Sequence, residues 1–277
     1  MTTTAFTSSA SGGSTSGGFT LIELAIVVFI ITLMFGFILV PLQSQVENRR
    51  FADTQRILDQ AREALIGYAV ANGYFPCPAD YAGGSGGQEA TGSTHTVGVG
   101  ACAATVVAGG ATNVYIGYLP AVTLGFTPTD SQGYAVDAWG LIQNRIRYAV
   151  SSQAVNGINS PFTNTSGMRS AGMSNIMSAS LLNVCNTATG STATACAAGT
   201  TLTSNAIAVV WSLGANAATT GGTSTDEREN TESLATADRV FVMHDKSGGT
   251  GPEFDDIVNW ISTPMLFSRL IAAGQLP

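Results

Sequence analysis

An apolar run near the N-terminus limits the fold more than any other feature of the chain. From Phe19 to Val40 there are 22 residues and a single charged one, Glu23. As a helix this run spans roughly 33 Å, against about 30 Å for the hydrocarbon core of a bilayer. We therefore predict a membrane-spanning helix over residues 19–40. The competing interpretation, a helix buried in a globular core, usually involves a shorter apolar run.

The flanking residues distinguish a retained anchor from an ordinary secretory signal. Such a signal has a basic start, a shorter apolar core and small residues at a cleavage site just beyond it. Here the first 18 residues carry no charge, and the sequence Pro-Leu-Gln-Ser-Gln follows Val40. We expect the apolar run to remain in the mature protein.

Glu23 is the exception within the run. A charge inside a membrane helix costs on the order of 3 kcal/mol and usually has a partner. The first basic residue along the chain is Arg49, far from Glu23. Cleavage between Gly18 and Phe19 would create an amino terminus with Glu23 as the fifth residue. In a staggered stack of such helices, the amine of one subunit could then pair with Glu23 of another.

The stretch GGFTLIELAIVV, which starts at Gly17, resembles the N-terminal motif of the type IV pilin and type II secretion pseudopilin superfamily. The resemblance implies a leader over residues 1–18, cleavage after Gly18 by prepilin peptidase, N-methylation of Phe19 and an assembly role for Glu23. It also implies a single-pass inner-membrane protein with a periplasmic head. Its partners would be membrane lipid, other pilin or pseudopilin subunits and the inner-membrane assembly platform. The filament would then lie in the periplasm or at the cell surface.

Beyond the apolar run, residues 41–73 continue as an amphipathic helix. Apolar or small residues recur at steps of three and four, with charges at the intervening positions. Asn72-Gly73 and then Pro76 indicate where the helix stops. The apolar stripe predicts packing against a sheet, and its members are Phe51, Thr54, Ile57, Leu58, Ala61, Leu65 and Tyr68.

Residues 74–277 form the predicted head. Apolar or alternating runs predict strands at Arg145–Ser151, Ala206–Leu213, Arg239–Asp245 and Asp256–Ile261. Pro264 and Gly274 bracket a short final helix. We predict an α+β fold, in which a long N-terminal helix packs on an antiparallel sheet with long loops. The resemblance implies the same type IV pilin-like arrangement.

Four cysteines, Cys77, Cys102, Cys185 and Cys196, lie in the head, and none has the C-x-x-C spacing of a zinc or redox site. Three pairings are possible, and proximity in the sequence favours Cys77–Cys102 and Cys185–Cys196. Paired cysteines are typical of the periplasm or the cell exterior. The alternative is a set of free buried thiols in a cytosolic protein.

Three short head segments extend the resemblance to the major pseudopilins. They are DAWG from Asp137, WSLGANA from Trp211 and FDDIVNWIS from Phe254, and the last two belong to a calcium loop in that family. Ala138 replaces the family's Pro, Asn216 replaces an Asp, and an insertion over residues 218–253 separates the two loop segments.

The resemblance, with the acidic residues of the last segment, implies a calcium site formed by Leu213, Asn216, Asp255 and Asp256. The turn from Leu213 to Asn216 would contribute backbone carbonyls and the Asn216 side chain. Successive side chains of a strand point to opposite faces, so Asp255 and Asp256 could both bind only before a strand begins. The alternative interpretation is a solvated acidic turn.

Composition and motifs argue against other functions. Only 10% of the residues are charged and the net charge is -7, which is unlike the basic surface of a nucleic-acid-binding protein. Residues 83–87 read G-G-S-G-G, which fits the hydrolase elbow formally, but they lie in low-complexity sequence. His95 and His244 are the only histidines. We predict a non-enzymatic subunit of a type II secretion pseudopilus or related filament. The alternative is a minor type IV pilin with an adhesive or partner-binding head.

The cleavage motif makes a direct prediction. In cells with an active prepilin peptidase, mass spectrometry of the purified protein should find a mature N-terminus at Phe19. Recovery of the intact chain beginning at Met1 from such cells would contradict the predicted processing.

Overall fold

The computed structural model describes residues 18, 20–90, 100–107, 113–218, 224–231, 235–247 and 253–275, without the side chains at 35–43. Phe19 and most of the predicted leader therefore lie outside the described residues. The chain divides into two compact units, residues 1–48 and 49–277. Each unit is described by itself below.

The first unit contains the start of helix α1, Leu21–Asn72. The Thr20 hydroxyl accepts a hydrogen bond from the backbone N–H of Glu23 at 3.3 Å, and the Thr20 carbonyl accepts one from Leu24 at 3.2 Å. Thr followed three positions later by Glu is the spacing of a capping box. The sequence therefore sets the start of α1 locally.

The apolar side chains from Leu21 to Met34 are largely exposed on α1. Among the described residues, no helix has a stretch that is both long and apolar enough to cross a membrane. The predicted span over residues 19–40 includes Phe19 and the side chains at 35–40, which are outside the described residues. It stays a prediction.

In the second unit, the last turns of α1 pack through the predicted apolar stripe. Leu58, Ala61 and Leu65 are fully buried, and so is the hydroxyl-bearing Thr54. The helix ends at Asn72, and Gly73 adopts the left-handed conformation that favours glycine, with φ of 81°. The amphipathic pattern and the stop at Asn72-Gly73 are confirmed.

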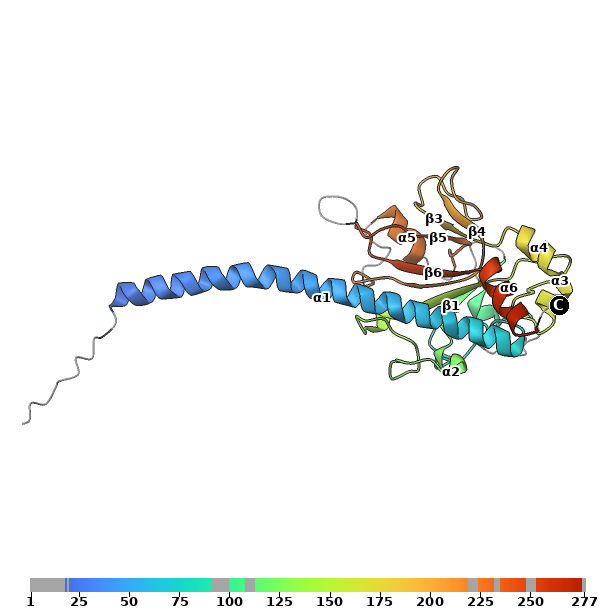
Figure 1. Ribbon diagram of the computed structural model, residues 1–277, viewed down its shortest axis with the longest axis horizontal. Coiled ribbons are helices and arrows are strands. Elements are labelled where there is room, and N and C mark those ends of the chain that lie inside the picture. The colour runs from blue at the N-terminus through green and yellow to red at the C-terminus, as the bar shows by residue number, and fades with distance from the viewer. Residues whose placement is uncertain are drawn as a thin grey trace, which may run out of the picture. The chain divides into compact units, whose positions relative to one another are not determined.

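The second unit also holds a six-stranded sheet, which confirms the predicted α+β class (Figure 1). The prediction found four of its strands and missed β1 and β3, which lie beside Gly/Thr-rich sequence. The strands are β1 Val114–Tyr118, β2 Arg147–Ser151, β3 Leu182–Cys185, β4 Thr201–Ser212, β5 Val240–Val242 and β6 Ile257–Ser262.

Strand β4 is the centre of the sheet. Ala206 pairs with both Leu182 of β3 and Ser262 of β6, while Trp211 pairs with both Arg147 of β2 and Val258 of β6. Because a strand has two edges, β6 occupies one edge of β4, and β2 and β3 share the other. β1 extends the sheet beyond β2, and β5 runs parallel to β3. The sheet therefore has two arms, β2–β1 and β3–β5, along one edge of β4.

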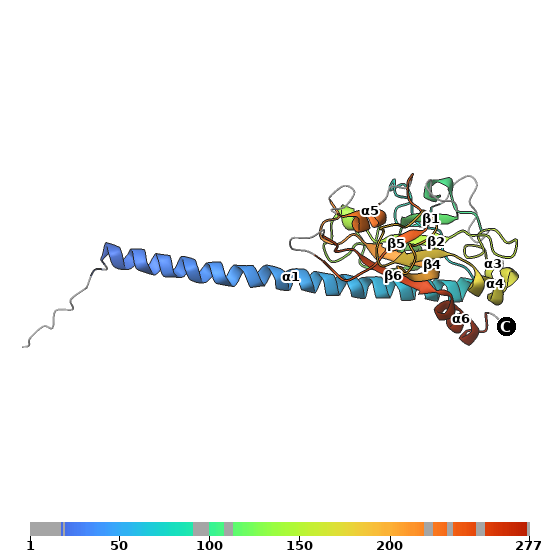
Figure 2. The same cartoon turned by 90° about the horizontal axis from the view of Figure 1, so that it is seen from above.

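Alternate residues of the strands point to opposite faces of the sheet. Tyr148, Val150 and Val210 belong to the core that contains Leu58 and Leu65 of α1. Ala149 and Val209 belong to a second apolar cluster on the other face, together with Trp211. Figure 2 shows the strands to one side of α1, so the helix covers a single face.

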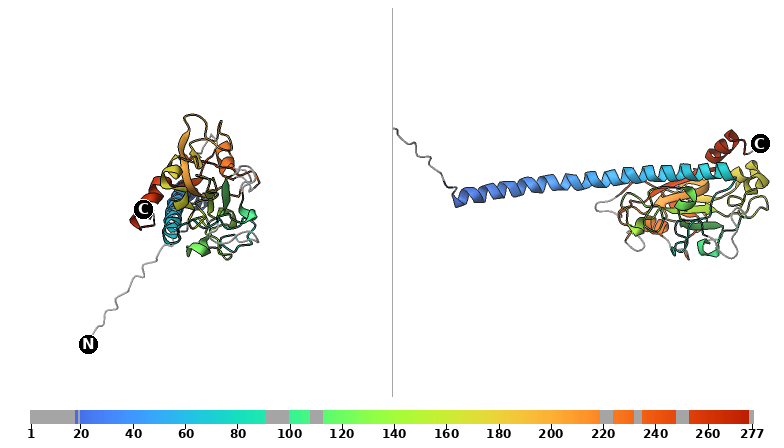
Figure 3. Two further views of the ribbon diagram at one scale, coloured as in Figure 1. Left: turned by 90° about the vertical axis from the view of Figure 1, so that its right-hand side faces the viewer. Right: turned by 90° about the horizontal axis from the view of Figure 1, so that it is seen from below.

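Short helices fill the connections between strands. They are η1 Ala104–Val106, α2 Ala121–Leu124, η2 Ile142–Asn144, α3 Gly167–Ala171, α4 Met173–Ser178, α5 Thr225–Thr231 and α6 Thr263–Ala272. The predicted final helix is confirmed as α6, which begins with Pro264 in its first turn. Figure 3 shows α6 beside the last turns of α1. An ion pair joins the two helices, with Arg269 Nη2 3.4 Å from Glu63 Oε2.

The buried stripe of α1 generates a stability prediction. Leu65→Ala should lower the free energy of unfolding of the head by about 2–5 kcal/mol, because it leaves a cavity between helix and sheet. The control Gln60→Ala, on the exposed face of the same helix, should change it by less than about 0.5 kcal/mol. Urea unfolding followed by circular dichroism measures both. Equal effects of the two substitutions would contradict this packing.

Candidate functional site

The predicted processing residues are described only in part. Gly18 is exposed, and Phe19 lies outside the described residues. Glu23 is exposed in the first turn of α1. Their roles in cleavage and assembly stay predictions. The contact with Thr20 uses the backbone N–H of residue 23 and so does not depend on its side chain. The spacing Thr-x-x-Glu fits a capping box. A carboxylate in the first turn also complements the positive end of the helix dipole.

Both favoured cysteine pairs are confirmed. Cys77 is bonded to Cys102 with Cα atoms 5.7 Å apart, and Cys185 to Cys196 with Cα atoms 5.6 Å apart. The alternative of four free thiols is therefore wrong. Each bond closes a loop of small and polar residues that has few apolar side chains of its own.

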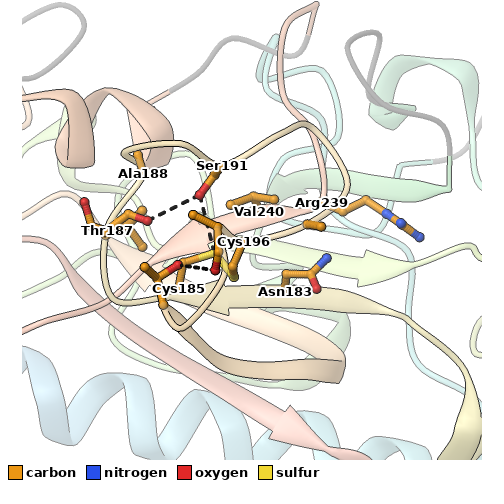
Figure 4. The surroundings of a disulfide bond; sticks show 12 residues. Asn183, Cys185, Thr187, Ala188, Ser191, Cys196, Arg239 and Val240 are labelled. Carbon is orange, nitrogen blue, oxygen red and sulfur yellow. Dashed lines mark hydrogen bonds between the residues drawn. A yellow bond between two sulfur atoms is a disulfide. The ribbon is translucent and has the colours of Figure 1, made fainter.

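The second disulfide fixes a loop beside the arm β3–β5 (Figure 4). Inside the loop, the Ser191 hydroxyl donates to the Thr187 carbonyl at 3.3 Å. The Thr194 carbonyl accepts from the Asn183 side chain at 2.9 Å and from the Arg239 guanidinium at 3.2 Å. The loop is thus anchored on Asn183 within β3 and on Arg239, which directly precedes β5.

Three buried carboxylates form the strongest candidate site. Oxygen atoms of Glu227, Asp255 and Asp256 all lie within 4.8 Å of one another, and the three residues are at most 4% exposed. Glu227 comes from α5, while Asp255 and Asp256 directly precede β6. Because β6 begins only at Ile257, its alternation does not separate the two aspartates. Their burial shows that the alternative of a solvated acidic turn is wrong.

Hydrogen bonds hold one oxygen of each aspartate and leave the other unpaired. Asp255 Oδ2 accepts from the Ala215 N–H at 2.7 Å, and Asp256 Oδ2 accepts from the Asn230 side chain at 2.8 Å. Both Oδ1 atoms are buried without a hydrogen-bond partner. Buried carboxylate oxygens are costly without a partner, so these two atoms point to a bound cation.

The turn after β4 is built around the same cluster. Gly214 has a φ of 66°, and a Cβ atom there would overlap the Asp255 carboxylate. The Gly214 carbonyl accepts from the Asn144 side chain at 2.5 Å, and the same amide donates to Asp137 at 3.0 Å. Ser212 donates to Asp137 at 2.5 Å. Hydrogen bonds therefore bring together the three segments that carry the pseudopilin resemblance.

The structure adds Glu227 to the predicted ligand set. The insertion separates the two loop segments in the sequence but not in space, because the Ala215 N–H donates to Asp255 Oδ2. Helix α5 of the insertion supplies Glu227 to the cluster. Asn216 reaches the cluster through Glu227, whose Oε1 accepts from the Asn216 side chain at 2.7 Å. The Leu213 side chain is buried in the second apolar cluster, which leaves only its backbone carbonyl as a candidate ligand.

Sequence reasoning missed Glu227 because the residue lies in an inserted segment with no counterpart in the resemblance. The one available signal was the neutral Asn216 at a position where the family has a carboxylate. A compensating acidic residue was to be expected in the loop, but nothing in the spacing identified which one.

The electrostatics of the cluster follow from burial. Burial, together with the neighbouring Glu227 and Glu253, raises the pKa of Asp255 to about 6. Burial also raises the pKa of Asp256 well above its usual range, against the hydrogen bond from Asn230. A cation among the three carboxylates would remove this penalty.

Calcium fits this donor set. It takes hard oxygen ligands at about 2.4 Å, so two ligands of one ion lie up to about 5 Å apart. The 4.8 Å spread of the carboxylate oxygens agrees with that limit. The ion would be held by Glu227, Asp255 and Asp256. It would therefore link α5 to the start of β6.

The formal hydrolase elbow lacks its expected surroundings. Residues 81–88 form turns and bends, without a strand before Ser85 or a helix directly after it. The Ser85 hydroxyl accepts from the Asp80 N–H at 3.0 Å. His244 lies 3.3 Å from Asp226, and His95 lies outside the described residues.

Comparison of the chain with models of protein families, with curated proteins and with solved structures finds no match. The N-terminal motif and the geometry of the head are therefore the two indications of function.

The acidic cluster generates a metal-removal prediction. A calcium chelator should lower the melting temperature of the protein, and Asp256→Ala or Glu227→Ala should abolish that response, because each removes a carboxylate from the cluster. Glu63→Ala, which removes an exposed carboxylate from α1, should leave the response intact. A wild-type melting curve that chelator does not change would eliminate the site.

The raised pKa of Asp255 generates a pH prediction for the metal-free protein. Its folded pKa of about 6 exceeds the ordinary value of 3.8, so the folded state binds this proton more tightly. The resulting stability is present below pH 3.8 and is lost as the pH rises through about 6. With chelator present, Asp255→Asn should therefore gain stability relative to wild type between pH 4 and pH 7. Melting temperatures are measured for both proteins across this range. A difference between Asp255→Asn and wild type that does not change with pH would contradict the raised pKa of Asp255.

Proposed function

We propose that this protein is a structural subunit of a type II secretion pseudopilus or a related type IV pilus-like filament. The observation that carries the proposal is the motif Gly18-Phe19-Thr20-Leu21-Ile22-Glu23 at the start of an apolar segment. Cleavage after Gly18 and methylation of Phe19 would give a mature subunit with Glu23 as its fifth residue. Prepilin peptidase would process it, and an inner-membrane platform would assemble it with other subunits.

Glu23 has two separable tasks in this proposal. Its backbone N–H donates a hydrogen bond to the Thr20 hydroxyl, which caps the start of the helix. Its carboxylate would pair with the amino terminus of a neighbouring subunit when the helix leaves the lipid. A buried amine and a buried carboxylate compensate each other, which gives the register between subunits an energetic basis.

The head supports a location outside the cytoplasm. Two disulfides are typical of an oxidising compartment, such as the periplasm or the cell exterior. The buried acidic cluster at the junction of α5, the β4 turn and the start of β6 supports a calcium-stabilised head, as in major pseudopilins. Both features suit a structural role, in which a rigid head is displayed beyond the membrane.

Substitutions at Glu23 test the proposal. Glu23→Ala and Glu23→Gln should both leave the protein in the membrane and strongly reduce its incorporation into filaments, since each removes the charge. Gln can occupy the same capping-box position as Glu, so Glu23→Gln keeps the local start of the helix. Membrane fractionation and recovery of sheared or cross-linked filaments measure the two properties.

A matched control comes from the same helix. The Thr32 hydroxyl donates to the Val28 carbonyl at 2.7 Å within α1, so Thr32→Ala removes a polar group without removing a charge. It should assemble like the wild type. If Glu23→Gln also assembled like the wild type, assembly would not need the charge of Glu23, and the assembly role of the carboxylate would be wrong.

A further inference from the structure

A polar pocket lies where the two arms of the sheet diverge from β4. It has a volume of about 470 Å³. One wall is the segment after β2, the second is the end of α4 and the residues that follow it, and the third is Arg239, which directly precedes β5. Its polar lining residues are Gln153, Asn156, Asn175, Ser180 and Arg239.

Arg239 dominates the chemistry of this pocket. The residue is only 9% exposed, and its Nε atom is buried without a hydrogen-bond partner. Its other nitrogens donate to the Gln153 side chain at 3.1 Å and to the Thr194 carbonyl at 3.2 Å, both of which are neutral acceptors. Within the described part of the chain, no carboxylate lies at ion-pair distance from Arg239.

The adjacent Asp238 does not take the place of such a partner. Its carboxylate accepts from the Val240 N–H at 2.7 Å, and burial raises its pKa to about 6. Burial likewise lowers the pKa of Arg239, which Asp238 partly offsets. A buried guanidinium normally has a closely paired anion, because a desolvated charge is costly without one.

The pocket is held in place from several sides. Figure 4 shows the Arg239 side chain directed away from the disulfide, while the disulfide loop accepts its hydrogen bond through Thr194. On the other two walls, the Asn156 and Asn175 side chains both donate to the Ala171 carbonyl, at 3.4 and 2.9 Å. Asn156 and Gly157, with φ of 52° and 76°, form the tight turn between Val155 and Ile158, which fixes this part of the pocket wall.

We propose that this pocket binds an oxyanion, a carboxylate or phosphate group, on a small ligand with hydroxyl substituents. The guanidinium of Arg239 is the anion-binding group, since a planar fork of donors matches both oxyanions. The amides and the Ser180 hydroxyl provide hydrogen bonds for neighbouring hydroxyls. Apart from Arg239, every lining residue is neutral, so no acidic side chain repels the ligand.

Titration calorimetry on the full-length protein in detergent tests the proposal. The probes are inorganic phosphate, acetate and glucuronate, each at constant ionic strength and with a calcium chelator present. We expect saturable binding of at least one probe, with a dissociation constant of about 1 mM or below. Binding of phosphate alone identifies a phosphate ligand, and binding of glucuronate more tightly than acetate identifies a hydroxylated carboxylate.

Three variants locate the binding. Arg239→Gln should weaken it about tenfold or more, as expected for the loss of a charge-assisted hydrogen bond. Asn175→Ala keeps the guanidinium and should weaken glucuronate binding more than acetate binding. Arg169→Gln removes a matched charge from α3, where Arg169 donates to the Gln275 carbonyl, and should bind like the wild type.

Several results would overturn the proposal. One is the absence of saturable binding by all three probes, and another is an equal loss in Arg169→Gln, which would indicate general attraction of anions. Thermal unfolding establishes whether Arg239→Gln is folded. If it is not, glucuronate binding that Asn175→Ala leaves unchanged also counts against the pocket. The readout is independent of filament assembly, so it stands apart from the proposed function.

Discussion

A helix with a buried apolar stripe needs an apolar surface to cover it, and the sheet face around β4 provides that surface. Leu58, Ala61 and Leu65 are fully buried there, against side chains such as Tyr148 and Val210. This contact covers only one face of the sheet. Side chains on the opposite face pack into a separate apolar cluster that contains Trp211. The remainder of the head is arranged on this two-sided sheet.

The double pairing of β4 explains where the polar sites lie. β6 covers one edge, so the start of β6 meets the turn that follows β4, and the acidic cluster forms at that meeting point. On the other edge β2 and β3 follow each other along the strand, and the chain leaves the sheet between them. The Arg239 pocket occupies that break. Each site is therefore a consequence of strand ends rather than of strand faces.

The two sites carry opposite charge and share one physical problem. Asp255 and Asp256 each have a buried oxygen without a partner, and Arg239 has a buried nitrogen without one. Interiors rarely leave such atoms unpaired, because desolvation is not compensated. In each case an ion or ligand of the opposite charge would provide the missing partner, as proposed above. The disulfide at Cys185–Cys196 supports the second site by fixing the loop that receives the Arg239 hydrogen bond.

Local patterns in the sequence predicted much of this fold. The three- and four-residue spacing of apolar side chains predicted the packed turns of α1, and Asn72-Gly73 predicted their end, because both signals depend on neighbours along the chain. Strands β2, β4, β5 and β6 and the final helix were found for the same reason. The favoured cysteine pairs were correct since each closes a short loop. The segment that begins at Phe254 marks Asp255 and Asp256 as candidate ligands, although nothing in it shows that they are buried.

Tertiary structure alone decided what distant segments do together. Glu227 joins the aspartates only because α5 folds back onto the start of β6, and no spacing in the sequence encodes that approach. β1 and β3 lie in or beside Gly/Thr-rich sequence, and their pairing with β2 and β4 supplies the order that local propensity lacks. Arg239 likewise becomes a pocket residue only through Gln153 and Thr194, which belong to other parts of the chain. The sequence by itself determined the elements with strong local periodicity, whereas long-range packing determined which polar groups are buried and which of them converge.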